Sequence, residues 1–159
     1  MLPNDVFERQ YDQAILALQA SMSRLAPFAL IDSEATRDFW RGRVHPFAVN
    51  ACPFEIILHR RQRYDITIGP ETYEERTISS VAIFAPLLEA VAGANLIVRR
   101  WKSAMSGAAV AVETLVTLAD GSLWRDRRDT ILGTLGSETT LVRDDQHFVP
   151  YKRATNRAA

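Results

Sequence analysis

The sequence predicts an α+β fold in which N-terminal helices pack on a strongly curved antiparallel β-sheet. Three observations favour this fold: an apolar stripe of helical period near the N-terminus, segments of period two in the centre and in the C-terminal half, and turn signals between those segments. The expected order is two helices, two strands, a third helix and four strands. We expect one domain over residues 1–153 and a disordered tail over residues 154–159.

The first helix is indicated by apolar residues that recur at steps of three and four. Asn4 is expected to cap this helix and Pro27 to end it. A helix with one apolar face packs that face against a core. The residues of the stripe are Phe7, Tyr11, Ala14, Ile15, Leu18, Met22 and Leu25.

Two shorter helices are expected after the first. The second begins at Asp32 or Ser33 and ends at Gly42, before a loop over residues 43–53 that contains two prolines. The third lies within residues 79–95, where Pro86 either begins the helix or kinks it, because proline is tolerated only in the first turn.

The strands are indicated by alternation of apolar and polar residues. Residues 54–59 and 63–68 alternate in this way and are expected to form a hairpin. Asp120-Gly121 is typical of a tight turn between two strands. The expected C-terminal strands cover residues 96–102, 108–118, 122–132 and, with an interruption at 144–146, residues 138–151.

The composition limits the kinds of function. The chain has 159 residues, of which 47% are hydrophobic, and its 19 basic and 19 acidic side chains give a formal net charge of zero. That balance argues against a nucleic-acid surface, which needs a positive field. No segment is apolar enough to span a membrane, and the polar N-terminus does not resemble a signal peptide. The single cysteine, Cys52, is expected to be a buried structural thiol, and we expect a cytoplasmic protein.

The order of elements resembles the nuclear-transport-factor-2-like cone fold, which includes SnoaL-like and ketosteroid-isomerase-like proteins. Residues 127–132 resemble a charged strand of ring-hydroxylating dioxygenase small subunits, and residues 141–149 resemble the last strand pair of the superfamily. The resemblance implies a curved sheet whose mouth is closed by helices, around a pocket that holds a small molecule or is filled by side chains. No position matches the catalytic Asp or Tyr of the isomerase.

The charged segment Trp124–Asp129 carries the main candidate for chemistry. In a strand, Trp124, Asp126 and Arg128 share one face, and Arg125 and Arg127 share the other. If the first face points into the cone, Asp126 is a candidate general base. Alternatively, the segment is a solvated or interface strand whose charges pair with neighbouring strands.

Other candidate residues come from separate elements. Asp65 and Tyr11 join Asp126 as candidates for acid/base catalysis. An Arg beside an aromatic ring can bind an anion, and a carboxylate within an apolar strand needs a cationic partner. Candidate ligand-binding residues are Trp124, Arg128, Trp101, Arg99 and Glu113.

No metal or cofactor is expected, because the three histidines, His45, His59 and His147, form no pair with metal-ligand spacing. Two functions remain open. The first is binding of a small molecule in the cone pocket, with cofactor-independent lyase or isomerase chemistry. The alternative is a non-catalytic assembly subunit that uses its sheet surface as the interface of a homo-oligomer, a dimer or a trimer. No nucleic-acid or membrane partner is expected.

Overall fold

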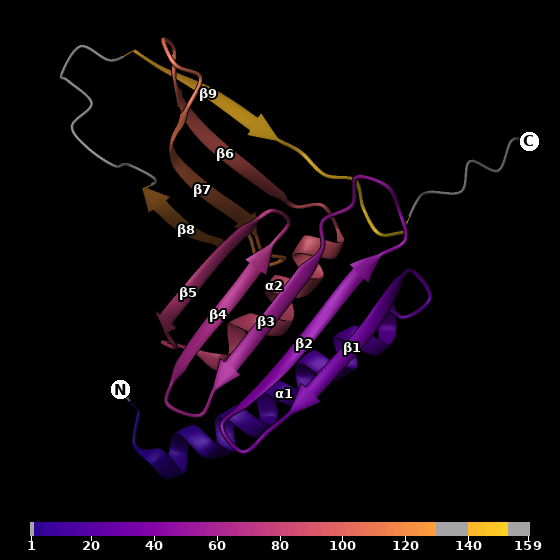
Figure 1. Cartoon of the computed structure of the whole chain (residues 1–159). Helices are drawn as coiled ribbons and strands as arrows, with labels where there is room; N and C mark the ends of the chain where they lie inside the picture. Colours follow the sequence, from indigo (N-terminus) through magenta and orange to yellow (C-terminus); the bar gives the residue numbers. More distant parts are fainter. Residues whose placement is uncertain (1, 130–139, 153–159) are drawn as a thin grey trace, which may run out of the picture.

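The computed structural model describes residues 2–129 and 140–152, and within them the chain forms two α-helices and nine strands (Figure 1). All strand pairs within the sheets are antiparallel, so the α+β class is confirmed. The strands form two sheets, however, where one was expected, and neither closes into a barrel. The larger sheet has the order β1-β2-β3-β4-β5, and the smaller sheet has the order β8-β7-β6-β9.

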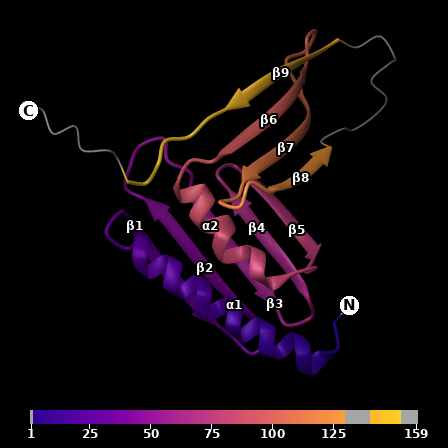
Figure 2. The same ribbon diagram turned by 180° about the vertical axis from the view of Figure 1, so that it is seen from behind.

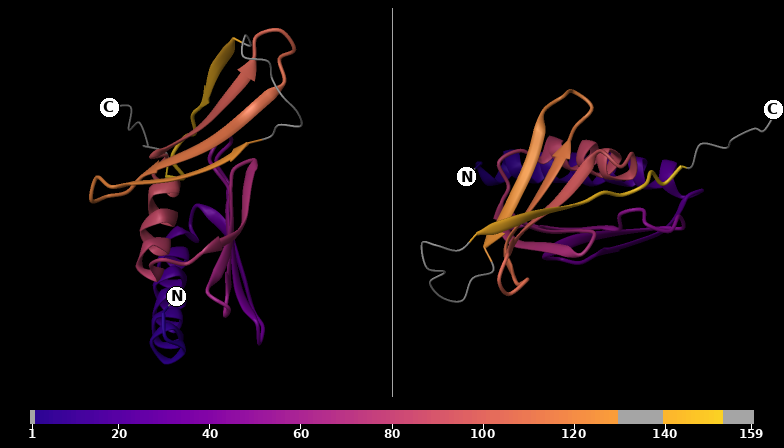
Figure 3. Two further views of the ribbon diagram at one scale, coloured as in Figure 1. Left: turned by 90° about the vertical axis from the view of Figure 1, so that its left-hand side faces the viewer. Right: turned by 90° about the horizontal axis from the view of Figure 1, so that it is seen from above.

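The helices cover one face of the larger sheet, and the smaller sheet lies across one end of this two-layer body (Figures 2 and 3). Helix α1 also packs along α2. The helices are α1 (Asn4–Leu25) and α2 (Phe84–Ala92), and the strands of the larger sheet are β1 (Ala29–Ala35), β2 (Phe39–Pro46), β3 (Phe54–His59), β4 (Arg63–Ile68) and β5 (Glu71–Thr77). The strands of the smaller sheet are β6 (Leu96–Ser103), β7 (Ala109–Thr117), β8 (Leu123–Asp129) and β9 (Leu141–Gln146).

Helix α1 buries the apolar stripe that its sequence indicates. Five of the seven predicted positions are buried, and Ile15 and Leu25 pack against the same core half-buried. The helix begins at Asn4, so the N-cap position belongs to Pro3 and the prediction that Asn4 caps the helix is wrong. The helix ends at Leu25, two residues before Pro27. The five buried residues are Phe7, Tyr11, Ala14, Leu18 and Met22.

The expected second helix is wrong, because its residues form the antiparallel hairpin β1–β2. In β2, the buried residues Trp40, Gly42 and Val44 alternate with the half-buried Arg41 and Arg43, which is a strand pattern. In the sequence Gly42 resembles a glycine that ends a helix, but in the structure it leaves room for a neighbouring side chain. A Cβ at position 42 would lie 2.6 Å from the Trp40 ring, so only glycine lets that ring lie flat on the strand.

The hairpin of β3 and β4 is confirmed, but strand β5 was not expected. Gly69 turns the chain with a φ of +59°, and β5 then pairs with β4. The sequence of β5, Glu-Thr-Tyr-Glu-Glu-Arg-Thr, is too charged to indicate a strand by itself. Two of its residues, Glu71 and Tyr73, are nevertheless buried, and both contact the smaller sheet.

Helix α2 begins at Phe84, two residues before Pro86, after a short 3₁₀ turn. Pro86 thus occupies the first turn of the helix, where a backbone N–H would have no intrahelical partner. The helix neither starts at this proline nor is interrupted by it. Gly93 occupies the C-cap position, as expected.

The C-terminal strands were predicted correctly up to Asp129, and residues 130–132 of the predicted third strand lie outside the described residues. Strand β9 runs through residues 144–146, so the expected interruption is wrong. Residues 138 and 139 also lie outside the described residues. After β9, Tyr151 returns to the core, where its hydroxyl donates to the Cys52 carbonyl and its N–H donates to the Ala92 carbonyl at 2.9 Å.

Within the described residues, no helix is long and apolar enough to cross a membrane. The tail over residues 154–159 lies outside them, and the single domain over residues 1–153 stays a prediction. Cys52 is fully buried, as expected, and burial raises the pKa of its thiol to about 12.

We predict that Cys52 is inert in the folded protein. Only the thiolate reacts with disulfide reagents, and with a pKa of about 12 roughly one thiol in 10⁴ is ionised at pH 8. Ellman's reagent should therefore label the thiol quickly in concentrated guanidinium chloride and at least ~100-fold more slowly in buffer. Equal labelling rates in the two conditions would contradict this burial.

Candidate functional site

The smaller sheet distributes six of the eight predicted site residues over its two faces. Trp124 and Asp126 of β8 point toward β5 of the larger sheet, and Arg128 lies on the same face. Three others, Arg99, Trp101 and Glu113, lie on the opposite face, since Glu113 pairs with Arg99 across β7 and β6. We call the first face the inner face and the second face the outer face. The sequence predicted correctly that these six residues lie on strands, but it did not predict that they lie on opposite faces of one sheet.

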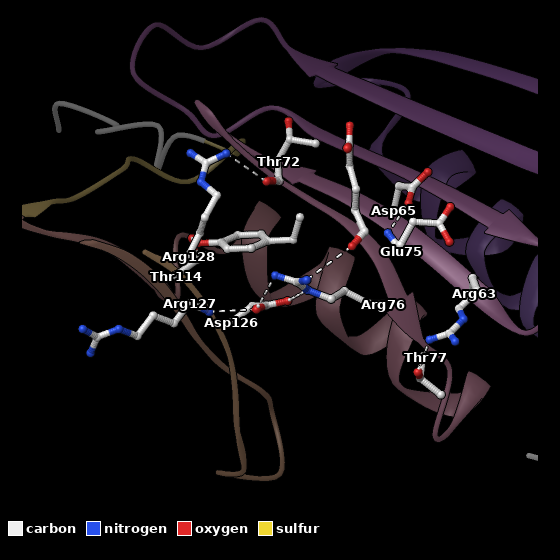
Figure 4. A network of polar contacts seen from close by, with 12 residues as sticks. Arg63, Asp65, Thr72, Glu75, Arg76, Thr77, Thr114, Asp126, Arg127 and Arg128 are labelled. Atoms are coloured by element: carbon white, nitrogen blue, oxygen red, sulfur yellow. Dashed lines mark hydrogen bonds and ion pairs between the residues drawn. The ribbon is translucent and has the colours of Figure 1, made fainter. Parts of the chain in front are cut away.

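On the inner face, Asp126 is held by an arginine of the larger sheet (Figure 4). The guanidinium of Arg76 donates two hydrogen bonds to its carboxylate, at 2.7 and 3.1 Å. This pairing raises the pKa of Arg76, chiefly through the hydrogen bond to Asp126. Both oxygens of the carboxylate are thus occupied by a partner from β5, so Arg76 would have to move before a substrate could reach them.

A second carboxylate, Glu71, joins the two sheets. Its side chain is only 8% exposed and accepts from Arg128 at 2.6 Å and from Arg100 at 3.2 Å. Arg128 also donates to the Thr72 carbonyl at 3.4 Å. Because a buried carboxylate needs compensating charge, the two arginines of the smaller sheet clamp the end of β5.

An open groove lies between the sheets at this point, with a volume of about 310 Å³. Its floor contains Tyr73, whose hydroxyl hydrogen-bonds the Thr114 hydroxyl at 2.8 Å and whose ring meets Trp124 edge-on at 6.4 Å. Burial raises the pKa of the Tyr73 phenol. The groove is lined by Thr72, Tyr73, Glu74, Arg76 and Arg128.

The outer face of the smaller sheet carries charges of alternating sign. Across four strands, the register places Arg127, Glu113, Arg99 and Asp145 side by side. Arg99 binds Asp145 through two hydrogen bonds of 2.9 and 3.2 Å, which lower the pKa of Asp145. The Arg99 guanidinium also lies 5.7 Å from the centre of the Trp101 ring.

Beside this charged row, the outer face has a hollow of about 490 Å³ whose lining is both apolar and polar. Ile97 and Leu115 face each other across β6 and β7, and the side chain of Leu123 is 54% exposed at the rim. The helices and the larger sheet lie together on the other side of the smaller sheet (Figure 3). Among the described residues, therefore, no helix or sheet covers the outer face.

The remaining two candidates lie away from both faces. Tyr11 is buried under the larger sheet, where its hydroxyl donates to the Leu58 carbonyl at 2.9 Å, and burial raises its pKa. Asp65 lies on the exposed face of the larger sheet. There it contacts His59 at 2.8 Å and accepts a hydrogen bond from the Glu75 N–H at 2.7 Å. The three acid/base candidates, Asp126, Asp65 and Tyr11, thus occupy three separate environments.

Some functional candidates were missed from the sequence. Glu71, Arg76 and Glu75 belong to β5, a strand that was not expected, so their neighbours could not be foreseen. His59 was considered only as one of a possible pair of histidines, although a hairpin brings it to a carboxylate. His59, Asp65 and Glu75 are the residues of the described chain that lie close enough together to hold a metal ion.

In comparisons with known proteins, no family model, no curated protein and no solved structure matches this chain. The assignment of function therefore rests on the geometry of the groove, the outer face and the surface of the larger sheet.

We predict that Glu71→Ala destabilises the fold by about 2–3 kcal/mol, because it removes the carboxylate that the partly buried Arg100 shares with Arg128. Chemical denaturation monitored by tryptophan fluorescence measures the change. Glu74→Ala is the matched control, since this neighbouring glutamate is exposed, and its effect should stay within about 0.5 kcal/mol. Equal effects of the two substitutions would show that Glu71 does not join the sheets.

Proposed function

We propose that this protein is a non-catalytic assembly domain that forms a homodimer through the outer face of its smaller sheet. The observation that carries this proposal is the combination of a hollow that contains Ile97, Leu115 and Leu123 with a row of alternating charges, on a face that no described element covers. Contiguous apolar surface with a polar rim is typical of association sites.

The interior of the protein supports this choice over catalysis in a cone. The space between the helices and the larger sheet is filled by large side chains that have almost no exposure. A cone enzyme would bring its acid and its base to one cavity, whereas here the candidates point to different places. The filling side chains include Tyr11, Leu18, Trp40, Ile56, Leu58 and Ile66.

The pattern of charges favours a second copy of the chain as the partner. In a twofold interface the same patch lies on both sides, so the patch must complement itself. The row Arg127, Glu113, Arg99 and Asp145 alternates in sign, so a copy in the opposite direction can set acids against bases. Ile97, Leu115 and Leu123 would then supply the dry centre of the interface.

The resemblance to the cone-fold superfamily supports the same role. The resemblance to the small subunits of ring-hydroxylating dioxygenases implies a filled interior and a charged strand that serves assembly. Here the charged strand is β8, whose outward residues Arg125 and Arg127 lie opposite Leu115 and Glu113 of β7. We place such a dimer in the cytoplasm.

Leu123→Glu should weaken the dimer by at least ~10-fold, because it places a charge beside the apolar side chains of the hollow, Ile97 and Leu115. Sedimentation velocity over a concentration series measures the dissociation constant. Leu16→Glu is the control, since Leu16 is 66% exposed on α1, and it should leave the constant unchanged. A wild-type protein that stays monomeric at every concentration contradicts the proposal.

A second candidate function is binding of a small anionic molecule in the groove between the sheets. The groove offers Arg76 and Arg128 beside the Tyr73 ring, and its volume of about 310 Å³ reaches the range of ligand sites. An anion that takes Arg76 would release Asp126 for the acid/base chemistry of a cofactor-independent lyase or isomerase.

A thermal-shift screen of small carboxylic acids tests this second candidate. Binding should raise the melting temperature of the wild type, and Arg128→Gln should abolish the shift because the groove loses a cation. Arg125→Gln removes a cation from the other face of the same strand and should keep the shift. A shift that survives Arg128→Gln would place the ligand elsewhere.

A further inference from the structure

The exposed face of the larger sheet carries a cluster of three side chains that suit a metal ion. His59 of β3, Asp65 of β4 and Glu75 of β5 each present one ligand atom, and these atoms lie within 4.8 Å of one another. The His59 Nε2 and the Asp65 Oδ2 are 2.8 Å apart. This cluster belongs neither to the groove nor to the outer face of the smaller sheet.

An irregularity in the strand pairing brings the third residue in. The register of β4 and β5 shifts between Tyr64 and Ile66, and Glu75 adopts a φ of +54° at this bulge. Bulges re-aim side chains, and the bulge here turns Glu75 toward Asp65 (Figure 4). If the pairing of Ile66 with Tyr73 continued without the shift, Asp65 would lie opposite Glu74 and not opposite Glu75.

The histidine and the aspartate are held in place before any ion arrives. The Glu75 N–H donates to Asp65 Oδ1 at 2.7 Å, which leaves Oδ2 directed at His59. The Phe39 ring meets the imidazole edge-on, with the ring centres 6.2 Å apart. The two side chains are 17% and 21% exposed, so their rotamers are restricted while their polar atoms still reach solvent. Such support is typical of the surroundings of metal ligands.

We propose that His59, Asp65 and Glu75 bind a first-row divalent cation, Zn²⁺ in particular. One imidazole nitrogen and two carboxylate oxygens are ligands that Zn²⁺ prefers, and the two carboxylates balance its charge. Ligands at about 2.0–2.2 Å from one ion lie about 3–3.6 Å apart, so the cluster closes with small side-chain movements. Water fills the remaining positions, because the site faces solvent.

Binding requires two exchanges at the site. In the contact of 2.8 Å, the His59 Nε2–H donates to Asp65 Oδ2, so this hydrogen bond has to break before Nε2 can offer a lone pair to the ion. The bound ring then keeps one proton on Nδ1, and the Nε2 proton moves to Nδ1 or, if Nδ1 already carries one, leaves to solvent. Arg61, which binds both carboxylate oxygens of Glu75, has to release them. The Arg61 side chain is 59% exposed, and exposed ion pairs of this kind are weak and screened by salt. Arg61 is thus a competitor of the ion.

Calorimetric titration of the full chain with ZnCl₂ tests the proposal, with Co²⁺ absorption as a second readout of the ligand set. We expect one ion per chain, with binding at least ~10-fold weaker in His59→Gln and tighter in Arg61→Gln. The two variants shift the affinity in opposite directions, which a merely misfolded protein would not do.

His45→Gln is the matched control, since His45 is exposed on β2 of the same sheet and should leave the affinity unchanged. The proposal is overturned if His59→Gln binds Zn²⁺ as tightly as the wild type, if His45→Gln accounts for the loss, or if Arg61→Gln binds no tighter. Circular dichroism confirms that each variant is folded.

Discussion

The structure depends on the packing of α1 and α2 against one face of the larger sheet. Large side chains from both layers fill this space, so the core has the close packing of an ordinary protein interior. Tyr11 illustrates the consequence, because its hydroxyl is used for a bond to a β3 carbonyl and is not available to a ligand. Because this space is filled, our proposals concern the surfaces, where the groove, the outer face and the His59 cluster lie.

The smaller sheet is fixed to this body by polar contacts as well as by apolar ones. Trp124 and Val116 extend the core, while Glu71 and Asp126 each bind arginines across the boundary between the sheets. Charges on the inner face are therefore satisfied within the chain. On the outer face, the charges of the described residues pair with neighbours on the same surface, and in our proposal a partner with the opposite pattern uses them.

Much of the fold could be predicted from local patterns. The stripe of α1 and the alternation of β3 and β4 depend on residues close in sequence. The hairpin β1–β2 was mistaken for a helix because Gly42 resembles a helix-ending glycine, whereas it lies under the Trp40 ring of its own strand and beside Met22 of α1, a tertiary contact. Strand β5 was missed because its buried Glu71 is stabilised by arginines about thirty and sixty positions away. The alternation of the sequence placed Asp126 and Arg128 on one face. Their partners in β5 are distant in sequence, and no local pattern predicts them or the bulge that brings Glu75 to His59.

Hydroxyl-radical footprinting of the wild type at low and high protein concentration tests the central claim, that function lies on the outer face, most directly. Trp101 and Leu123 mark that face, while Leu16 and Leu30 mark exposed surfaces of α1 and β1. We expect that oxidation of Trp101 and Leu123 falls as the concentration rises and that oxidation of Leu16 and Leu30 stays constant. Protection of Leu16 or Leu30 with Trp101 and Leu123 unchanged would contradict this claim.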